Sequence, residues 1–398
     1  MKQFILNIVC TILPAIILFA CEKSDADHQT PIIDTAENVV FDPDTIFNVN
    51  SGTILNELFW EEVQYALGRG DVLVRFSAGE YTLSQPIVIK NVGHSEHLLR
   101  ISAQALNRTI IQGDIPTLML IENTQNIQLY GFTLTGSPTE HGLEIRNCRN
   151  VKAEYCHFQD MPNISVASLG IYESTTNSNV INCRFERVGA TDKTHMIYVD
   201  NQVSRVNVIG NYFKDCSGSF VYYGGNTTDY GMHYKNDFIS TGNYLHGTNP
   251  VFIEISADNS INPGNQYILS NYVFVDNTFS YGNMGSQENL WAVVFHNSGF
   301  SPVDRNYDLS KADANTLDSG TIVEKQTIMS TQLGLTSEKI YFSGNVNRNV
   351  SHNVLYRYTN MHGSTNSWEG TADIENALNS ETPVKSKDEA LTFYNQEG

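Results

Sequence analysis

Val206-Asn-Val-Ile-Gly-Asn211-Tyr-Phe213 is the stretch that decides the fold, because variants of it return along much of the chain. Each copy has alternating apolar residues, then Asn or Cys, then one variable residue, and then an aromatic residue or Leu. The other copies span residues 127–132, 151–158, 180–185, 239–245 and 273–279, with a weaker one at 343–346. Their closing residues lie 26, 27, 28, 32 and 34 positions apart. A period in the twenties built from short β-rich runs predicts a stacked solenoid.

The position two before the closing residue indicates which kind of solenoid this is. It is occupied by Cys156, Cys183, Asn211, Asn243 and Asn277. Stacked coils would place these side chains roughly 4.8 Å apart, which lets Asn amides hydrogen-bond along the stack. The repeat units contain short strands and no convincing helix. We therefore predict an all-β fold, a right-handed parallel β-helix, whose growing spacing reflects lengthening loops along one edge.

The N-terminal residues 1–20 read as a lipoprotein signal peptide. Lys2 precedes an apolar run, and Leu18-Phe19-Ala20-Cys21 matches a bacterial lipobox. Lipidated Cys21 would hold the protein on a membrane without a spanning helix. Residues 21–45 read as an acidic flexible tether, which resembles that of Bacteroidetes surface lipoproteins. We expect an outer-membrane lipoprotein exposed at the cell surface; the alternative is a plain secretory signal or a membrane anchor.

The rest of the chain reads as one domain. We place the β-helix at residues 46–365, with a long loop or insertion at 300–340, and a closing segment at 366–398. Residues 56–68 are amphipathic and end at Gly68, which predicts a helix. It would cover the first coil, whose strand edges otherwise invite association. Four further cysteines, for which packing thiols are favoured over disulfides, are Cys148, Cys156, Cys183 and Cys216.

The segment after the predicted helix carries a family resemblance. Gly70-Asp71, an apolar run, Ala78-Gly-x-Tyr-x-Leu83 and Pro86-Ile-x-Ile89 precede Thr109-Ile-Ile-Gln-Gly-Asp114. This order resembles the opening of the pectate-lyase-like superfamily, and it is most similar to the chondroitinase-B and alginate-lyase branch over about residues 45–290. The resemblance implies a β-helix that engages polysaccharide. The reaction stays open, because the fold hosts lyases, hydrolases, epimerases and non-enzymes.

Charge limits the partners. The chain has 24 basic and 43 acidic residues and a net charge of −19, which becomes −20 if Lys2 is removed. Such a field repels nucleic acid and anionic membranes, so we expect no nucleic-acid partner. It also repels a polyanionic polysaccharide, which would then need a calcium bridge or a local basic patch.

The strands opposite the Asn positions offer one continuous face. They span residues 143–146, 169–172, 195–200, 220–223, 251–255 and 292–296. Side chains alternate along a strand, so we expect one set of polar residues to point outward. The predicted substrate-binding residues on this face are Glu144, Arg146, Tyr172, Asp200, Tyr223 and Glu254.

The densest polar cluster on this face predicts the catalytic residues His195, Tyr198 and Tyr222. In β-elimination at a uronic acid, a base removes the C5 proton, an acid protonates the leaving oxygen, and a cation neutralises the carboxylate. A His/Tyr pair could act as base and acid, with Arg146 or Arg205 as the neutralising group. The family's Lys and Arg pair cannot be carried over, because Phe220-Val-Tyr-Tyr-Gly-Gly225 contains neither.

Calcium is the expected cofactor if a metal is used. Acids near the face that could supply oxygen ligands are Asp192, Asp200, Asp229, Asp237 and Asp258. Solubilising surface acids are the favoured alternative. The sequence thus favours a cell-surface lyase acting on a uronic-acid-containing polysaccharide. The alternatives are a non-catalytic glycan-binding or adhesive β-helix, and a C5 epimerase or glycoside hydrolase on the same scaffold.

Overall fold

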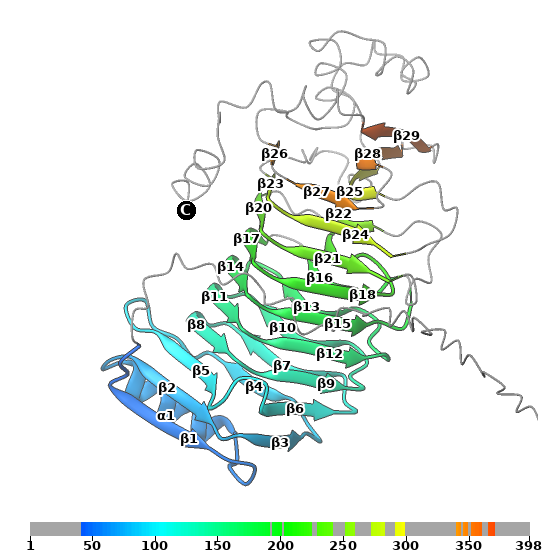
Figure 1. Ribbon diagram of the computed structural model, residues 1–398. Coiled ribbons are helices and arrows are strands. Elements are labelled where there is room, and N and C mark those ends of the chain that lie inside the picture. Colours follow the sequence, from blue (N-terminus) through cyan, green and yellow to red (C-terminus); the bar gives the residue numbers. More distant parts are fainter. Residues whose placement is uncertain are drawn as a thin grey trace, which may run out of the picture.

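The computed structural model describes residues 41–191, 193–200, 203–224, 229–241, 251–258, 272–282, 291–298, 340–343, 345–348, 352–359 and 365–370. Over these ranges the chain coils into a parallel β-solenoid with one short helix, α1 (Glu57–Leu67), at its N-terminal end (Figure 1). The predicted signal peptide, most of the tether with Cys21, nearly all of the 300–340 segment, and residues 371–398 lie outside the described residues.

Three sheets run along the solenoid, and each coil contributes one strand to each sheet. Sheet A contains ten strands, in spatial order β1 (Thr45–Val49), β2 (Val72–Phe76), β5 (Leu99–Ala103), β8 (Gln125–Tyr130), β11 (Arg149–Glu154), β14 (Thr176–Ile181), β17 (Ser204–Ile209), β20 (Asp229–Tyr234), β23 (Tyr272–Val275) and β26 (Ile340–Ser343).

Sheet B contains nine strands. They are β3 (Gly79–Thr82), β6 (Thr109–Gly113), β9 (Thr133–Gly136), β12 (His157–Met161), β15 (Arg184–Val188), β18 (Tyr212–Cys216), β21 (Asp237–Ser240), β24 (Thr278–Tyr281) and β27 (Val346–Arg348).

Sheet C contains ten strands and carries the face that the sequence singled out. They are β4 (Ile87–Lys90), β7 (Thr117–Glu122), β10 (His141–Arg146), β13 (Ala167–Tyr172), β16 (His195–Val199), β19 (Val221–Tyr223), β22 (Val251–Asp258), β25 (Trp291–Ser298), β28 (His352–Thr359) and β29 (Thr365–Gly370). Among the described strands every pairing is parallel except that of β28 with β29. The fold prediction is confirmed.

An Asn ladder and a column of aromatic rings hold the later coils in register. Asn211 Nδ2 donates to Asn236 Oδ1 at 3.1 Å, Asn236 Nδ2 to Asn277 Oδ1 at 2.9 Å, and Asn277 Nδ2 to Asn345 Oδ1 at 3.0 Å. Beside the ladder a buried column has ring centroids 4.7–5.0 Å apart; its members are Phe158, Phe185, Phe213, Phe238 and Phe279. Both features match the repeat in the sequence.

One copy of the repeat was placed wrongly. Asn236 bonds both Asn211 and Asn277, so it occupies the ladder position that the sequence assigned to Asn243. Phe238 likewise takes the place expected for Leu245. The spacing is therefore 25 residues from Phe213 to Phe238 and 41 from Phe238 to Phe279. The spacing does not grow steadily, because it falls to 25 before it rises to 41, and the next ladder interval, from Asn277 to Asn345, is 68 residues.

Helix α1 covers the first coil, as predicted. Asn56 Oδ1 accepts a hydrogen bond from the Phe59 N–H at 3.1 Å and caps the helix N-terminus. Trp60, Val63 and Leu67 lie buried against the core. Each such side chain contributes about 1.5–3 kcal/mol by leaving water. Within the described ranges no helix has the length and apolar character that a membrane crossing requires.

The four cysteines of the solenoid are buried and free, as the packing interpretation predicted. The Cys183 N–H donates to Asn211 Oδ1 at 2.8 Å, so Cys183 continues the Asn ladder into the earlier coils. Its thiol bonds the Ile181 carbonyl at 3.4 Å. A small buried side chain is sufficient at this position.

Candidate functional site

The outward side chains of sheet C stand in two rows, because parallel strands in register stack equivalent positions. The first row is Val88, Leu120, Glu144, Gly170, Tyr198, Tyr222 and Glu254. The second row is Lys90, Glu122, Arg146 and Tyr172. The register therefore brings together most of the residues that the sequence predicted for one face.

A β-bulge brings His195 to the same face as Tyr198. The N–H groups of Met196 and Ile197 both donate to the Phe220 carbonyl, at 3.1 and 3.0 Å. Both of these side chains are buried, so strict alternation is interrupted between His195 and Tyr198. Bulges of this kind re-aim a side chain. Without the bulge, His195 would point into the core.

Aromatic rings stack along the face from His195 to Tyr172. The His195 and Tyr222 centroids lie 4.6 Å apart, those of Tyr222 and Tyr198 5.4 Å, and those of Tyr198 and Tyr172 5.6 Å. The interplanar angles are 15°, 18° and 31°. Since neighbouring rings cover one another's faces, the row offers mainly ring edges and hydroxyl groups to a ligand.

His195 is locked in this row. Its Nδ1 lies 3.2 Å from the Ser219 carbonyl, which fixes the proton on Nδ1. Burial lowers the pKa of His195 to about 4, so the ring is neutral at neutral pH. The three predicted catalytic residues thus lie side by side. The contacts of His195 are those of a residue that holds the Tyr222 ring in place.

His141 is the residue that sequence reasoning missed. Its Nε2 lies 2.6 Å from the Tyr172 hydroxyl. Burial, and to a lesser degree the charge of Arg146, lower the pKa of His141 to about 4. Neutral His141 can therefore accept the Tyr172 proton. The available signal was a repeated phrase, since His141-Gly-Leu-Glu144 matches His195-Met-Ile-Tyr198 two coils later.

Glu144 and Arg146 complete this group. The Arg146 guanidinium is hydrogen-bonded to Glu144 Oε1. Among the described residues His141 Nδ1 has no hydrogen-bond partner, and it lies 3.9 Å from Glu144 Oε2. Burial raises the pKa of Glu144, although the bond to Arg146 opposes this. At rest His141 is neutral and makes no ion pair, yet Glu144 is placed to stabilise an imidazolium.

Both tyrosine hydroxyls remain protonated at neutral pH. Burial raises the pKa of Tyr172, and the nearby Tyr198, Glu144 and Asp200 raise it further. Burial also raises the pKa of Tyr198, with Asp200 as the next cause. Each hydroxyl is thus a proton donor in its resting state.

Two glycines make room for the rings. A Cβ on Gly170 would lie 2.3 Å from Tyr172 Cε2 and 2.8 Å from His141 Cδ2. A Cβ on Gly224 would lie 2.5 Å from Tyr222 Cε1 and 3.0 Å from the Tyr198 hydroxyl. Tyr172 and Tyr222 therefore lean over the backbone of these glycines and do not stand straight out from the sheet.

Tyr223 was assigned wrongly to the outer face. It pairs with Val199, an inward position, and is 2% exposed. Its hydroxyl bonds His233 Nε2 at 2.9 Å inside the solenoid. Glu254, by contrast, extends the first row, and its Oε2 accepts from the Ser219 hydroxyl at 2.9 Å. Asp200 follows β16 and lies near enough to Tyr198 to raise its pKa.

A calcium site finds no support in the part of the chain that the structure describes. There, no group of three or more His, Cys, Asp or Glu side chains converges as a metal site requires. Asp192 and the side chains of Asp229 and Asp258 lie outside the described residues.

Comparison with known proteins gives low similarity. No family model matches the sequence, and no curated protein matches it. Among solved structures the chain is similar to an alginate lyase from Paenibacillus sp., with 12% identity and a TM-score of 0.45 over 65% of this chain and 94% of that chain.

Two further structures are similar. One is a family 28 exopolygalacturonase from Yersinia enterocolitica, with 12% identity and a TM-score of 0.37 over 78% of each chain. The other is a mannuronic acid specific family 6 polysaccharide lyase from human gut microbiota, with 10% identity and a TM-score of 0.34 over 67% of this chain and 70% of that chain. The chain thus resembles β-helix carbohydrate enzymes at low identity, and a likeness of this size assigns it no activity.

Proposed function

We propose that the protein binds a polysaccharide along the outer face of sheet C and cleaves it by β-elimination at a uronic acid residue. The observation that carries this proposal is the 2.6 Å contact between the Tyr172 hydroxyl and His141 Nε2. A hydroxyl bonded to a neutral imidazole, with a carboxylate behind the imidazole, is the arrangement that activates an oxygen for proton abstraction.

Side chains on the outer face of sheet C can take up and supply each proton that the reaction moves. Tyr172 Oη takes the C5 proton as its own proton moves to His141 Nε2, and Glu144 stabilises the imidazolium. The electron pair of the C5–H bond forms the C4–C5 double bond, and the bond from C4 to the glycosidic oxygen breaks. The Tyr198 hydroxyl, on the next coil, gives its proton to the leaving oxygen. Proton transfer from His141 to Tyr198 through solvent then restores the resting state.

Arg146 is the group that would neutralise the uronate carboxylate. Its side chain is 42% exposed, and its guanidinium carbon lies 5.9 Å from the centre of the Tyr172 ring. A guanidinium has five donors, so Arg146 can bind a carboxylate while it holds Glu144. His195 and Tyr222 would position Tyr198 from the other side of the row.

Absorbance at about 235 nm, where the new double bond absorbs, tests the proposal. Substrates would be alginate, pectate, chondroitin and dermatan sulfates, heparin and hyaluronan, each with calcium and with chelator. We expect the rate on one substrate to fall roughly 10²- to 10⁴-fold in Tyr172→Phe. Tyr155→Phe, a tyrosine change just after strand β11 of sheet A, is the control and should leave the rate unchanged. A Tyr172→Phe variant as fast as the wild type would contradict the mechanism.

A non-catalytic glycan-binding role is the second candidate. Two observations weigh against catalysis and so leave this role: the rings of the face are packed on one another, and Glu144 already holds Arg146. The net charge of −19 also weakens binding of an anionic chain. Binding in gel retardation with no absorbance on any substrate would select this role, or an epimerase, which leaves no double bond.

We also propose that Cys21 is lipidated and holds the protein at the surface of the outer membrane. The lipobox Leu18-Phe19-Ala20-Cys21 supports this. The wild type should fractionate with membranes and be cleaved by protease added to whole cells. Cys21→Ser should lose membrane association; retention of Cys21→Ser on the membrane would contradict the proposal.

A further inference from the structure

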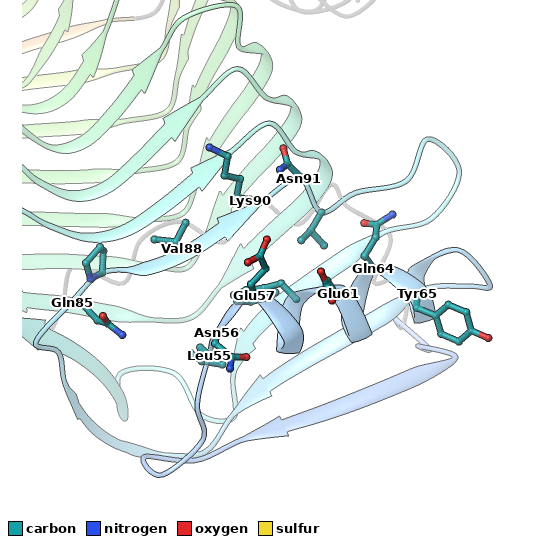
Figure 2. Close-up of a pocket in the computed structure, with 13 residues that line it drawn as sticks. Leu55, Asn56, Glu57, Glu61, Gln64, Tyr65, Gln85, Val88, Lys90 and Asn91 are labelled. Atoms are coloured by element: carbon teal, nitrogen blue, oxygen red, sulfur yellow. The ribbon is translucent and has the colours of Figure 1, made fainter.

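A cavity of about 750 Å³ lies where helix α1 meets the first strand of sheet C. Figure 2 shows Glu57, Glu61 and Gln64 on the helix and Val88 and Lys90 on the strand. The catalytic proposal above does not use this cavity. Its position and its lining both point to a ligand.

The cavity lies at the end of the two rows that form the candidate site. Val88 begins the first row and Lys90 begins the second. Lys90 and Tyr172 are three strands apart in the second row, about 14 Å at the usual strand spacing. A short oligosaccharide spans that distance. A glycan that passes Tyr172 along sheet C therefore reaches the cavity.

Helix α1 ends this path. Strand β4 is the edge strand at the N-terminal end of sheet C among the described strands, and α1 bounds the cavity beside it. Trp60, on the helix, is buried and lines the cavity. The outer face of sheet C is thus bounded at its N-terminal end, and the sugar that occupies the cavity would be the last of the chain.

The lining favours an uncharged sugar. The side-chain amides of Gln85 and Asn91 can bond hydroxyl groups, and Pro86 and Val88 offer apolar surface. Gln64 shapes the wall, because its amide is held by the N–H and carbonyl of Gly93. The Trp60 Nε1–H is buried and has no hydrogen-bond partner among the described residues.

The charges of the cavity point the same way. Glu57 and Glu61 line it, and Lys90 Nζ is paired with Glu122 Oε2 at 2.8 Å. A uronate placed between the two carboxylates would be repelled at close range. A sugar without a carboxylate meets no such repulsion.

We infer that this cavity is the subsite for a neutral terminal sugar of the glycan that lies along sheet C, an inference that rests on the proposed function. The substrate class is then a heteropolysaccharide that combines uronic acid with neutral sugars, not a homopolymer of uronic acid. Such a chain also carries less charge toward a protein of net charge −19. Cleavage would proceed from a chain end and release short products of one size.

Binding to Trp60 can be measured without catalysis. The full chain labelled with 5-fluorotryptophan gives a ¹⁹F resonance for Trp60, assigned with Trp60→Phe. The probes are neutral di- to tetrasaccharides of glucose, galactose, mannose and xylose, and matched oligogalacturonates. We expect at least one neutral oligosaccharide to shift the Trp60 resonance, and the oligogalacturonates to bind at least tenfold more weakly.

Two variants locate the effect. Val88→Phe fills the cavity and should weaken binding at least tenfold. Ile110→Phe is the matched control, because Ile110 is a half-buried aliphatic residue on the outer face of sheet B, and it should bind as the wild type does. The inference is overturned if no neutral oligosaccharide shifts Trp60, if oligogalacturonates bind as tightly, or if Val88→Phe binds normally.

Tyr172→Phe separates this inference from the proposed reaction, since it should abolish absorbance while leaving the Trp60 shift intact. If the wild type shows no lyase reaction on any substrate but neutral sugars still shift Trp60, the proposed reaction is wrong and the sugar site is supported. An active lyase without a Trp60 shift would support the reaction and overturn the sugar site.

Discussion

Gly170 controls the contact between Tyr172 and His141 at the scale of single residues. A Cβ there would overlap Tyr172 Cε2 at 2.3 Å, so Gly170→Ala must push the ring aside. Because the Tyr172 side chain is only partly buried, we expect the fold to tolerate the change. We expect Gly170→Ala to lower kcat at least tenfold while the melting temperature changes by only a few degrees, measured by the absorbance assay and thermal unfolding.

Gly68→Ala is the matched control, since its Cβ would meet nothing closer than 3.6 Å. It should leave both kcat and melting temperature unchanged. If Gly170→Ala keeps full activity, then the Tyr172–His141 contact is not needed for the reaction.

The residues that sequence reasoning placed well are those whose direction follows from alternation. Tyr198 and Tyr222 are paired neighbours in the first row. Tyr223 failed because two consecutive tyrosines must point to opposite faces, and only the register with Val199 shows which one is buried. His141 was missed because it stands three residues before Glu144, where strict alternation would bury it.

At the scale of an element, we expect the Asn ladder to contribute to the stability of the fold. Asn236 is fully buried, and its side chain bonds Asn211, Asn277 and the Val208 carbonyl. Asn236→Ala leaves several of these groups without partners, and each such group costs about 1–3 kcal/mol. We expect the free energy of unfolding, measured by urea titration, to fall by about 2–4 kcal/mol.

Asn207→Ala is the matched control, because it removes an Asn that lies outside the buried ladder. Asn207 is half-buried and makes one side-chain bond, Nδ2 to Asn179 Oδ1 at 2.8 Å, so its loss should cost less than about 1 kcal/mol. Equal costs for the two variants would show that the buried ladder adds nothing particular to stability.

The ladder also shows why the strands could be predicted and one coil could not. The repeat is defined only by Asn or Cys, then one variable residue, then a large apolar residue. Lys235-Asn236-Asp237-Phe238 and Gly242-Asn243-Tyr244-Leu245 both satisfy it. The choice is made by contact with Asn211 and Asn277 in neighbouring coils, which is information that a local pattern does not contain.

For the whole molecule, net charge sets the response to salt. A protein of net charge −19 repels an anionic glycan at long range, and about 0.15 M salt screens this beyond roughly 8 Å. Raising the salt concentration from 10 to 150 mM should therefore lower KM several-fold and leave kcat nearly unchanged. A KM that rises with salt would indicate instead that local basic groups such as Arg146 dominate binding.

Stability should fall when the pH drops below 6.5, because three buried histidines resist protonation in the folded state. Burial lowers the pKa of His141 and His195 to about 4 and that of His233 to about 3. Below pH 6.5 the unfolded chain binds these protons and the folded chain does not, so the free energy of unfolding decreases down to about pH 4. Between pH 6.5 and pH 4 each histidine can account for about 3 kcal/mol.

Carboxylates act in other parts of the pH range. Contacts with His157 and Arg184 lower the pKa of Glu186 to about 2, so its contribution is lost only below its ordinary value of 4.5. The raised pKa of Glu144 opposes the histidines in part. Urea midpoints at pH 7, 6, 5 and 4 should decline steadily, and His195→Phe, which keeps a ring against Tyr222, should make the decline shallower. An equal slope in the wild type and His195→Phe would show that His195 titrates normally and is not sealed beneath the aromatic row.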